Sequence, residues 1–119
     1  ALRGQVAWLF AACTYNGLSL LTLANGGKGF AGDMSTTRAA MAACILFAGV
    51  ICTGYLKSRV VYRLLAPISF LALFTGGVLK HVIADPAGYA SLSSWALAIF
   101  INVLGTTAFG LGVFAAYRN

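Results

Sequence analysis

Acidic residues are almost missing from this chain. It has 119 residues, of which only Asp33 and Asp85 are acids, and charged residues make up 8% of the sequence. A soluble domain has about 25% charged residues. A chain that is 61% apolar could not cover a water-facing surface with so few charges, and it would precipitate. The composition therefore excludes a soluble domain.

Ionisable residues are also missing from the middle of every long apolar run. Transporters coupled to protons or cations usually carry an ionisable group inside the membrane. The small multidrug antiporters, which also build four helices from a chain of this length, carry a membrane Glu that has no counterpart here. The sequence therefore argues against an ion-coupled transporter.

Histidine occurs once, as His81, so the chain cannot hold a haem between two histidines. A single His could still bind a chlorophyll or a five-coordinate haem iron. His81 follows Lys80 and precedes Asp85 by one helical turn, and a pair with Asp85 near the membrane surface is the simpler interpretation. His81 is nevertheless the one candidate cofactor-binding residue, and we expect no resident cofactor.

Cysteine chemistry and hydrolytic chemistry are both unsupported. The chain has three cysteines, all inside apolar runs and without the CxxC spacing of a zinc site, and their odd number argues against a disulfide framework. A membrane hydrolase needs a nucleophile with a base beside it, and one His and two surface acids do not supply the parts. We therefore expect no catalytic residues, no metal site and no enzyme. The cysteines are Cys13, Cys44 and Cys52.

What the chain does have is four uncharged runs, at 4–27, 39–56, 64–79 and 86–117. About 20 mostly apolar residues cross a bilayer as a helix. The third run is the shortest, and Arg63 and Lys80 can extend it by reaching to the two membrane surfaces. The prediction is a single all-α domain over 1–119, a bundle of four transmembrane helices. Their expected bounds are about 5–24, 38–56, 62–84 and 95–117.

A short basic turn predicts the orientation. Lys57, Arg59 and Arg63 lie between the second and third helices, and short loops rich in Lys and Arg stay on the cytoplasmic side. Counting Lys and Arg with both termini on that side gives five against three. We therefore expect both termini and the turn to face the cytoplasm of a bacterial inner membrane or the matrix of an organelle. The five are Arg3, Lys57, Arg59, Arg63 and Arg118, and the three are Lys28, Arg38 and Lys80.

The formal net charge of +6 does not indicate a nucleic-acid partner, because the charges stand at helix ends and form no basic stripe with aromatics between them. The glycine-rich stretch 25–33 resembles a phosphate-binding loop only weakly, since Lys28 is followed by Gly29 rather than Ser or Thr. A loop along the membrane surface is the better interpretation. Trp8 is expected as an anchor at the headgroup level.

Helix starts are expected at polar residues that can accept a bond from a free backbone N–H. For the second helix the candidates are Ser35, Thr36 and Thr37, and for the fourth they are Ser93 and Ser94.

Polar residues inside the first and fourth helices form a predicted polar layer of Asn16, Asn102 and Thr106. Counting about 1.5 Å of rise per residue from the inner surface places Asn16 and Thr106 at nearly equal depth, with Asn102 one turn away. A hydrogen bond between the two helices would satisfy these groups, at about 0.6 to 2 kcal/mol. A bond that joins the helices is favoured over a substrate site.

Small residues recur every four positions in two helices, which predicts two faces that allow a neighbouring backbone to approach closely. The bundle can use one face internally and leave the other for a partner, or it can use both internally. The first face is Ala40, Cys44, Ala48 and Cys52, and the second is Ala108, Gly112 and Ala116.

These features favour an accessory or structural subunit of a larger membrane complex, of the respiratory or photosynthetic kind, with other membrane subunits and lipids as partners and no nucleic acid. The first alternative is a small channel or transporter that acts through uncharged polar residues. The second is a subunit that binds a chlorophyll or a quinone through His81 and aromatic residues.

Overall fold

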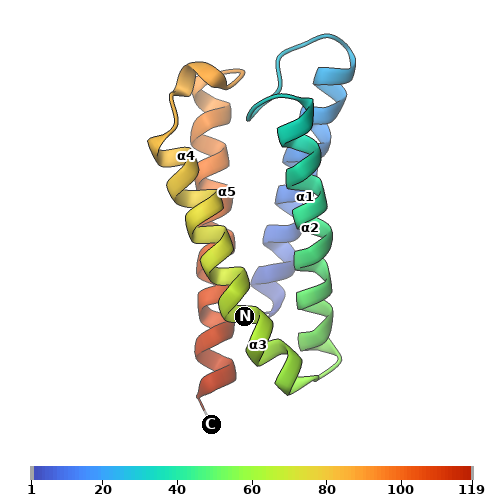
Figure 1. The fold of residues 1–119 in the computed structure, drawn as a ribbon, viewed down its shortest axis with the longest axis vertical. Coiled ribbons are helices and arrows are strands. Elements are labelled where there is room, and N and C mark those ends of the chain that lie inside the picture. The colour runs from blue at the N-terminus through green and yellow to red at the C-terminus, as the bar shows by residue number, and fades with distance from the viewer. Residues whose placement is uncertain (1, 119) are drawn as a thin grey trace.

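The computed structural model describes residues 2–118, and it confirms the predicted all-α architecture with four helical segments long and apolar enough to span a membrane (Figure 1). The third segment, Arg59–Ile83, is built from three consecutive helical pieces. A short 3₁₀ turn precedes the last helix. In chain order the elements are α1 (Leu2–Ala24), α2 (Met34–Tyr55), α3 (Arg59–Leu73), η1 (Phe74–Leu79, a π-helix), α4 (Lys80–Ile83), η2 (Pro86–Gly88) and α5 (Leu92–Tyr117).

The four segments form a ring in which only the backbones of neighbouring segments come close together. Helix α1 packs on α2 and α5, and α3 packs on the same two helices from the other side. The ends of the chain therefore lie at the same end of the bundle as the α2–α3 turn, as Figure 1 shows, and the two other loops lie at the opposite end. Connections between successive antiparallel helices are short, as is usual in bundles.

The ring is closed at one end and open at the other. Helix α3 starts beside α2 at the end that holds the termini and crosses toward α5, so that the third segment leaves α2 along its length (Figure 1). No Cα atom of α2 lies within 8 Å of a Cα atom in η1, α4 or α5. Side chains of α2 and of η1–α4 consequently face each other across a gap between the backbones.

Pro67 lies inside α3, three residues deeper in its helix than expected, because the helix begins at Arg59 rather than near Tyr62. A proline within a helix removes the N–H that would bond to the carbonyl four residues earlier. That carbonyl belongs to Arg63, and the hydroxyl of Tyr117 donates to it at 2.6 Å. Gly76 and Gly77 lie in the π-helical piece η1.

Both capped helices begin earlier than the sequence suggested. Asp33 caps α2 by accepting from the Thr36 N–H at 2.8 Å, so the expectation of Ser35, Thr36 or Thr37 as cap is wrong. Ser91 caps α5, and it forms a reciprocal pair with Ser94 in which each side chain accepts from the other residue's backbone N–H. The expectation that Ser93 or Ser94 is the cap is therefore wrong. A carboxylate is a stronger acceptor than a hydroxyl at a helix start.

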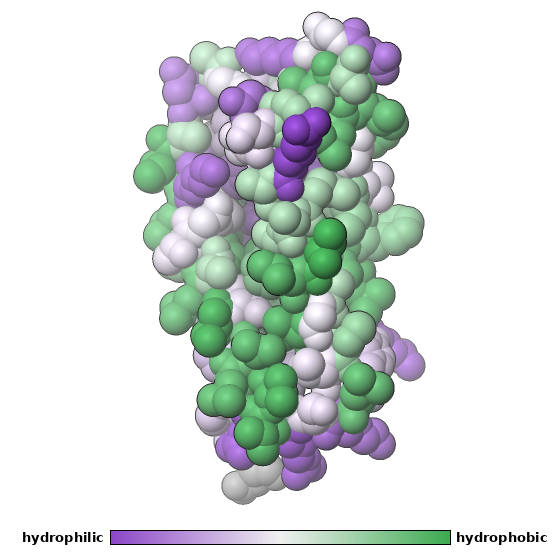
Figure 2. Space-filling view, turned by 45° about the vertical axis from the view of Figure 1, so that its right-hand side comes forward, coloured by the Kyte–Doolittle hydropathy of each residue, from purple (hydrophilic) through white to green (hydrophobic). Residues whose placement is uncertain are grey.

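Large apolar side chains cover the outside of the bundle, including Phe10, Ile45 and Ile83. Figure 2 shows hydrophobic side chains over the middle of the molecule and hydrophilic ones gathered at its two ends. An apolar belt between polar ends matches a bilayer with its two surfaces. The protein is therefore embedded in a membrane.

Candidate functional site

The gap between α2 and η1–α4 holds a cavity of about 510 Å³, which also reaches α1 and α5. We call it the α2–α4 cleft and define it by the four strongly polar residues of its lining that lie within the helical spans: Asn16, Lys80, His81 and Asn102. Most of the other wall is apolar or small, for example Phe47 and Ile101. Ligand pockets in proteins typically combine such walls with a few convergent polar groups.

Asn16 and Asn102 both line the cleft but do not bond to each other. The Asn16 side-chain amide donates to the Ala12 carbonyl at 2.9 Å, and Asn102 donates to the Ala98 carbonyl at 2.8 Å. The expected hydrogen bond between α1 and α5 through these amides is therefore wrong. The position of a residue in the sequence predicts its height along the helix axis, but it does not predict the direction in which the side chain points. An asparagine side chain can also reach the carbonyl four residues earlier in its own helix. Within residues 2–118 neither Oδ1 atom receives a hydrogen bond, so both remain acceptors.

Thr106, the third member of the predicted polar layer, is half-buried, and its hydroxyl has no hydrogen-bond partner among residues 2–118. It does not line the cleft. The polar layer therefore divides into two amides at the cleft and one hydroxyl enclosed elsewhere on α5.

The π-helical piece η1 makes room for Asn102. A Cβ atom on Gly77 would lie 3.1 Å from the Asn102 Cβ atom, closer than ordinary contact. Glycine is therefore required where η1 meets α5. A π-helical turn inside an α-helix is rare and is frequently found at functional sites, and here it forms part of the cleft wall.

His81 pairs with Tyr89 through its Nδ1 atom, and its carbonyl accepts from the Trp95 indole at 2.8 Å. The expected pair between His81 and Asp85 is wrong, because the Asp85 carboxylate accepts from the Ala87 N–H at 3.0 Å and caps η2. Burial raises the pKa of Tyr89 above its ordinary value. When the protonated hydroxyl of Tyr89 donates to Nδ1, the proton of a neutral His81 is on Nε2, and the other tautomer reverses the direction of the bond.

Loop 25–33 covers the end of the bundle beside the cleft. Lys28 Nζ donates to the Ala87 carbonyl at 2.7 Å, which ties this loop to the one after α4. The Phe30 N–H donates to Ser19 Oγ at 2.9 Å, and Ser94 Oγ donates to the Phe30 carbonyl at 3.0 Å. These bonds hold the glycine-rich stretch against the ends of α1 and α5.

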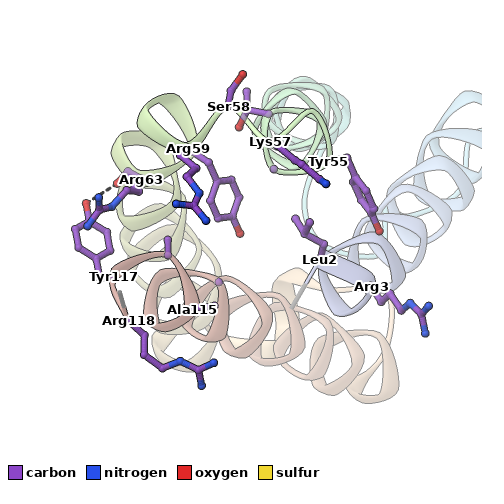
Figure 3. Close-up of a pocket in the computed structure, with 15 residues that line it drawn as sticks. Leu2, Arg3, Tyr55, Lys57, Ser58, Arg59, Arg63, Ala115, Tyr117 and Arg118 are labelled. Atoms are coloured by element: carbon purple, nitrogen blue, oxygen red, sulfur yellow. Dashed lines mark hydrogen bonds between the residues drawn. The ribbon is translucent and has the colours of Figure 1, made fainter.

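The opposite end of the bundle holds a second cavity of about 930 Å³ (Figure 3). We call it the basic pocket and define it by its five cationic residues. Tyr62 and Gly112 lie among its other lining residues. The three residues of the basic turn and the two terminal arginines thus come together at one site. The five residues are Arg3, Lys57, Arg59, Arg63 and Arg118.

Between the two cavities lies a layer that sequence reasoning missed. Gln5 is fully buried, and its amide donates to the Tyr62 hydroxyl at 2.7 Å and to the Ala108 carbonyl at 3.2 Å. Trp8 is 2% exposed and packs edge-on against Phe47 and Phe109, so its expected role as a surface anchor is wrong. An amide inside an apolar run needs a partner, and that rule could have identified Gln5.

The second small-residue face, on α5, is used inside the bundle. Ala108 and Gly112 are buried, and Gly112 lies against the Gln5 amide and the Tyr62 hydroxyl. Ala116 lines the basic pocket. This face brings α1 and α3 close to α5.

The first face, on α2, is divided along the helix. Ala40 and Cys44 line the α2–α4 cleft, Ala48 is half-buried, and Cys52 is exposed. It is therefore not one continuous groove for a neighbouring helix.

Comparison with known proteins adds no identification. No known protein family, no curated protein and no solved structure matches this chain. The function is therefore argued from the two cavities and the residues that line them.

Proposed function

We propose that this protein is a non-catalytic subunit of a membrane complex that binds a small, mainly apolar molecule through its carbonyl or hydroxyl groups. The α2–α4 cleft is the observation that carries the proposal, because it places a few polar groups inside a mostly apolar cavity between the helical spans. Its volume of about 510 Å³ falls within the range of about 300–1,000 Å³ that is usual for small-molecule sites. A quinone is the representative ligand.

The lining supplies partners for both redox forms of such a ligand. A quinone carbonyl can accept a hydrogen bond from the His81 Nε2–H or from the Lys80 ammonium group. A hydroquinone hydroxyl can donate to Asn16 Oδ1 or Asn102 Oδ1, neither of which receives a bond within the described chain. An apolar tail can leave between α2 and η1, whose backbones are separated. The molecule can then enter from the bilayer without crossing water.

Tryptophan fluorescence tests this binding. The chain has two tryptophans, and Trp95→Phe leaves Trp8, which lines the cleft, as the sole reporter. Quinones quench indole fluorescence on close approach. A short-tailed quinone titrated into the purified protein in nanodiscs should give saturable quenching.

A matched pair of substitutions makes the test specific. Ala43 lines the cleft, whereas its neighbour Ala42 is exposed on the outside of α2. Ala43→Phe fills the cleft and should weaken binding about tenfold or more, which corresponds to about 1.4 kcal/mol. Ala42→Phe adds the same ring on the lipid side and should leave binding unchanged. Quenching that grows linearly and equally in all variants would mean simple partitioning into the bilayer and would refute the proposal.

The complex that this subunit joins is testable by co-purification in a gentle detergent, where partners should appear at a fixed stoichiometry. The outer face of α2 supports such a contact, because Gly49 has no heavy atom within 4 Å of where a Cβ would stand and Cys52 is exposed. Small residues allow another helix to approach closely. Gly49→Leu should release the partners and leave the chain inserted, and Phe10→Leu, a change on the exposed face of α1, is the control.

A second candidate function is a path for small polar solutes through the bundle. It is favoured by the two cavities at opposite ends, separated by the Gln5–Tyr62 bond and the ring of Trp8. Liposomes that contain only this chain test it. Selective solute flux, accelerated by Phe109→Ala, would favour this function over the binding subunit.

A further inference from the structure

We propose that the basic pocket binds a phosphate group, carried either by an anionic lipid or by a soluble phosphate compound. Five cationic side chains line the pocket, and neither acid of the chain does. Asp33 and Asp85 lie in the loops at the opposite end of the bundle. The site thus collects positive charge that no carboxylate within residues 2–118 neutralises.

Two of the cations are held in place by aromatic rings. The Arg63 guanidinium lies 4.7 Å from the centre of the Tyr117 ring, and the Arg118 guanidinium lies 5.9 Å from the Phe114 ring. Lys57 and Arg59 make no side-chain hydrogen bond within the described chain. In Figure 3 the Arg59 side chain points into the space between the helices and Lys57 points toward α1, whereas Arg3 and Arg118 point outward. Lys57 and Arg59 are therefore the two cations available to a ligand.

The start of α3 lies at the same pocket, which Ser58 and Arg59 line. Ser58 stands at the N-cap but its side chain makes no cap bond. The Arg59 N–H is already bonded to the Lys57 carbonyl at 2.9 Å, so the helix contributes its dipole to the pocket. A helix of 15 residues carries partial positive charge at its N-terminus, which favours a bound anion.

The backbone of Lys57 forms the turn after α2, at the basic pocket. Its φ of 60° is the one positive value at a non-glycine residue in the described chain. Lys57 follows the C-cap of α2, where the Lys57 N–H bonds to the Gly54 carbonyl at 3.2 Å and the Ser58 N–H bonds to the Thr53 carbonyl at 3.0 Å. Glycine is the usual residue at this position, and a lysine there costs free energy that glycine would avoid. The turn places the Lys57 side chain in the lining of the pocket.

Phosphate fits this donor set better than other anions. Arginine presents a planar fork that matches phosphate oxygens, and an ammonium group acts beside it as a point charge. Leu2, Tyr55 and Ala115 also line the pocket and can contact an acyl chain next to a headgroup. The site stands at one end of the apolar belt, where lipid phosphates lie.

The experiment compares the two sources with the whole chain in detergent. Native mass spectrometry measures retained phosphatidylglycerol against phosphatidylcholine, and a thermal-shift titration with pyrophosphate measures soluble phosphate. Preferential retention of phosphatidylglycerol without a pyrophosphate effect assigns the lipid, and the reverse result assigns the soluble compound. The double variant Lys57→Gln with Arg59→Gln should weaken the observed binding about tenfold or more.

The control changes two cations at the other end, Lys28→Gln with Arg38→Gln, and it should leave binding unchanged. Lys57→Gly separates folding from binding, because it relieves the strained φ and should raise the melting temperature of the free protein while weakening phosphate binding. Equal retention of phosphatidylglycerol and phosphatidylcholine, together with no thermal shift from pyrophosphate, would overturn the proposal. An equal loss of binding in the control variant would also overturn it, because it would mean that only net charge matters.

Discussion

Tyr117 donates a hydrogen bond of 2.6 Å from its hydroxyl to the carbonyl of Arg63, and the two residues also meet through the guanidinium, which lies over the ring. The carbonyl is available because residue 67, its usual helical donor, is a proline. The last turn of α5 thereby completes the hydrogen bonding of the first turns of α3. This contact joins two of the elements that form the basic pocket.

The contribution of the Tyr117 hydroxyl to stability should depend on Pro67, and removing the hydroxyl tests this. We expect Tyr117→Phe to lower the free energy of unfolding by about 0.5–1.5 kcal/mol. In a Pro67→Ala background the helix regains its own donor, and the same change should cost close to nothing. A double-mutant cycle from reversible unfolding in mixed micelles measures both. An equal cost in the two backgrounds would show that the hydroxyl bond is unrelated to the proline.

Glycines at two positions on the small-residue faces should respond in opposite ways to alanine. A Cβ on Gly112 would collide with the Gln5 amide and the Tyr62 hydroxyl, whereas Gly49 has open space around it. We expect Gly112→Ala to destabilise by about 1–3 kcal/mol through overpacking. Gly49→Ala should be neutral or stabilise by about 0.5–1 kcal/mol, because glycine is a poor helix residue. Thermal unfolding of the two purified variants tests the contrast, and similar melting temperatures would contradict it.

The four spans could be predicted because length and hydropathy are sufficient for a helix in a bilayer. The angle of each helix about its axis could not, because lipid is as apolar as the bundle core, so the apolar pattern does not mark the inner face. Trp8 illustrates the problem: its place near a helix start suggested the membrane surface, yet it packs in the core. The sequence likewise did not show which small-residue face is internal, and the structure places Gly112 inside the bundle.

The candidate site was predictable only in part. His81 was singled out as the one histidine, and the structure places it in the cleft wall together with both asparagines of the predicted polar layer. The cleft itself depends on the crossing of α3 and on the π-helical turn at Gly77, and neither can be derived from composition. Tyr89 was missed as the partner of His81 because the fold of the loop that carries it determines the contact.

Asp33 should make the stability of the protein sensitive to acid. The hydrogen bond from the Thr36 backbone N–H holds the pKa of Asp33 below its ordinary value. A carboxyl group with a lowered folded-state pKa contributes stability above its unfolded pKa of about 3.9, and loses it as the pH falls through the folded value. Asp33→Asn keeps a capping oxygen that does not titrate.

Thermal unfolding of wild type and Asp33→Asn between about pH 6 and pH 2 measures this effect, since the two proteins differ in this one carboxyl group. The melting temperature of the wild type should fall more steeply below about pH 4. Parallel curves would show that the cap does not carry the pH dependence.

Asn16 and Asn102 should prove energetically independent. Each amide bonds within its own helix, and the bonds measure 2.9 and 2.8 Å. We expect a double-mutant cycle of Asn16→Ala and Asn102→Ala to give a coupling energy below about 0.5 kcal/mol, as for residues that share no direct contact. A coupling near the 0.6–2 kcal/mol of an interhelical hydrogen bond would mean that the two side chains bond across the cleft in the membrane.

The orientation of the bundle can be tested from the two ends that the structure defines. Both termini and the turn at Ser58 lie at the end with the basic pocket, and Ala87 lies in a loop at the other end. Because the five-to-three distribution of Lys and Arg favours the basic end inside, that end should face the cytoplasm or matrix. In a background with Cys13, Cys44 and Cys52 replaced by Ala, an impermeant thiol reagent added to intact cells should label Ala87→Cys and spare Ser58→Cys. Labelling of Ser58→Cys alone would mean that the bundle is inverted. Labelling of both positions would mean that the chain inserts in two orientations, because the two sides differ by only two Lys and Arg residues.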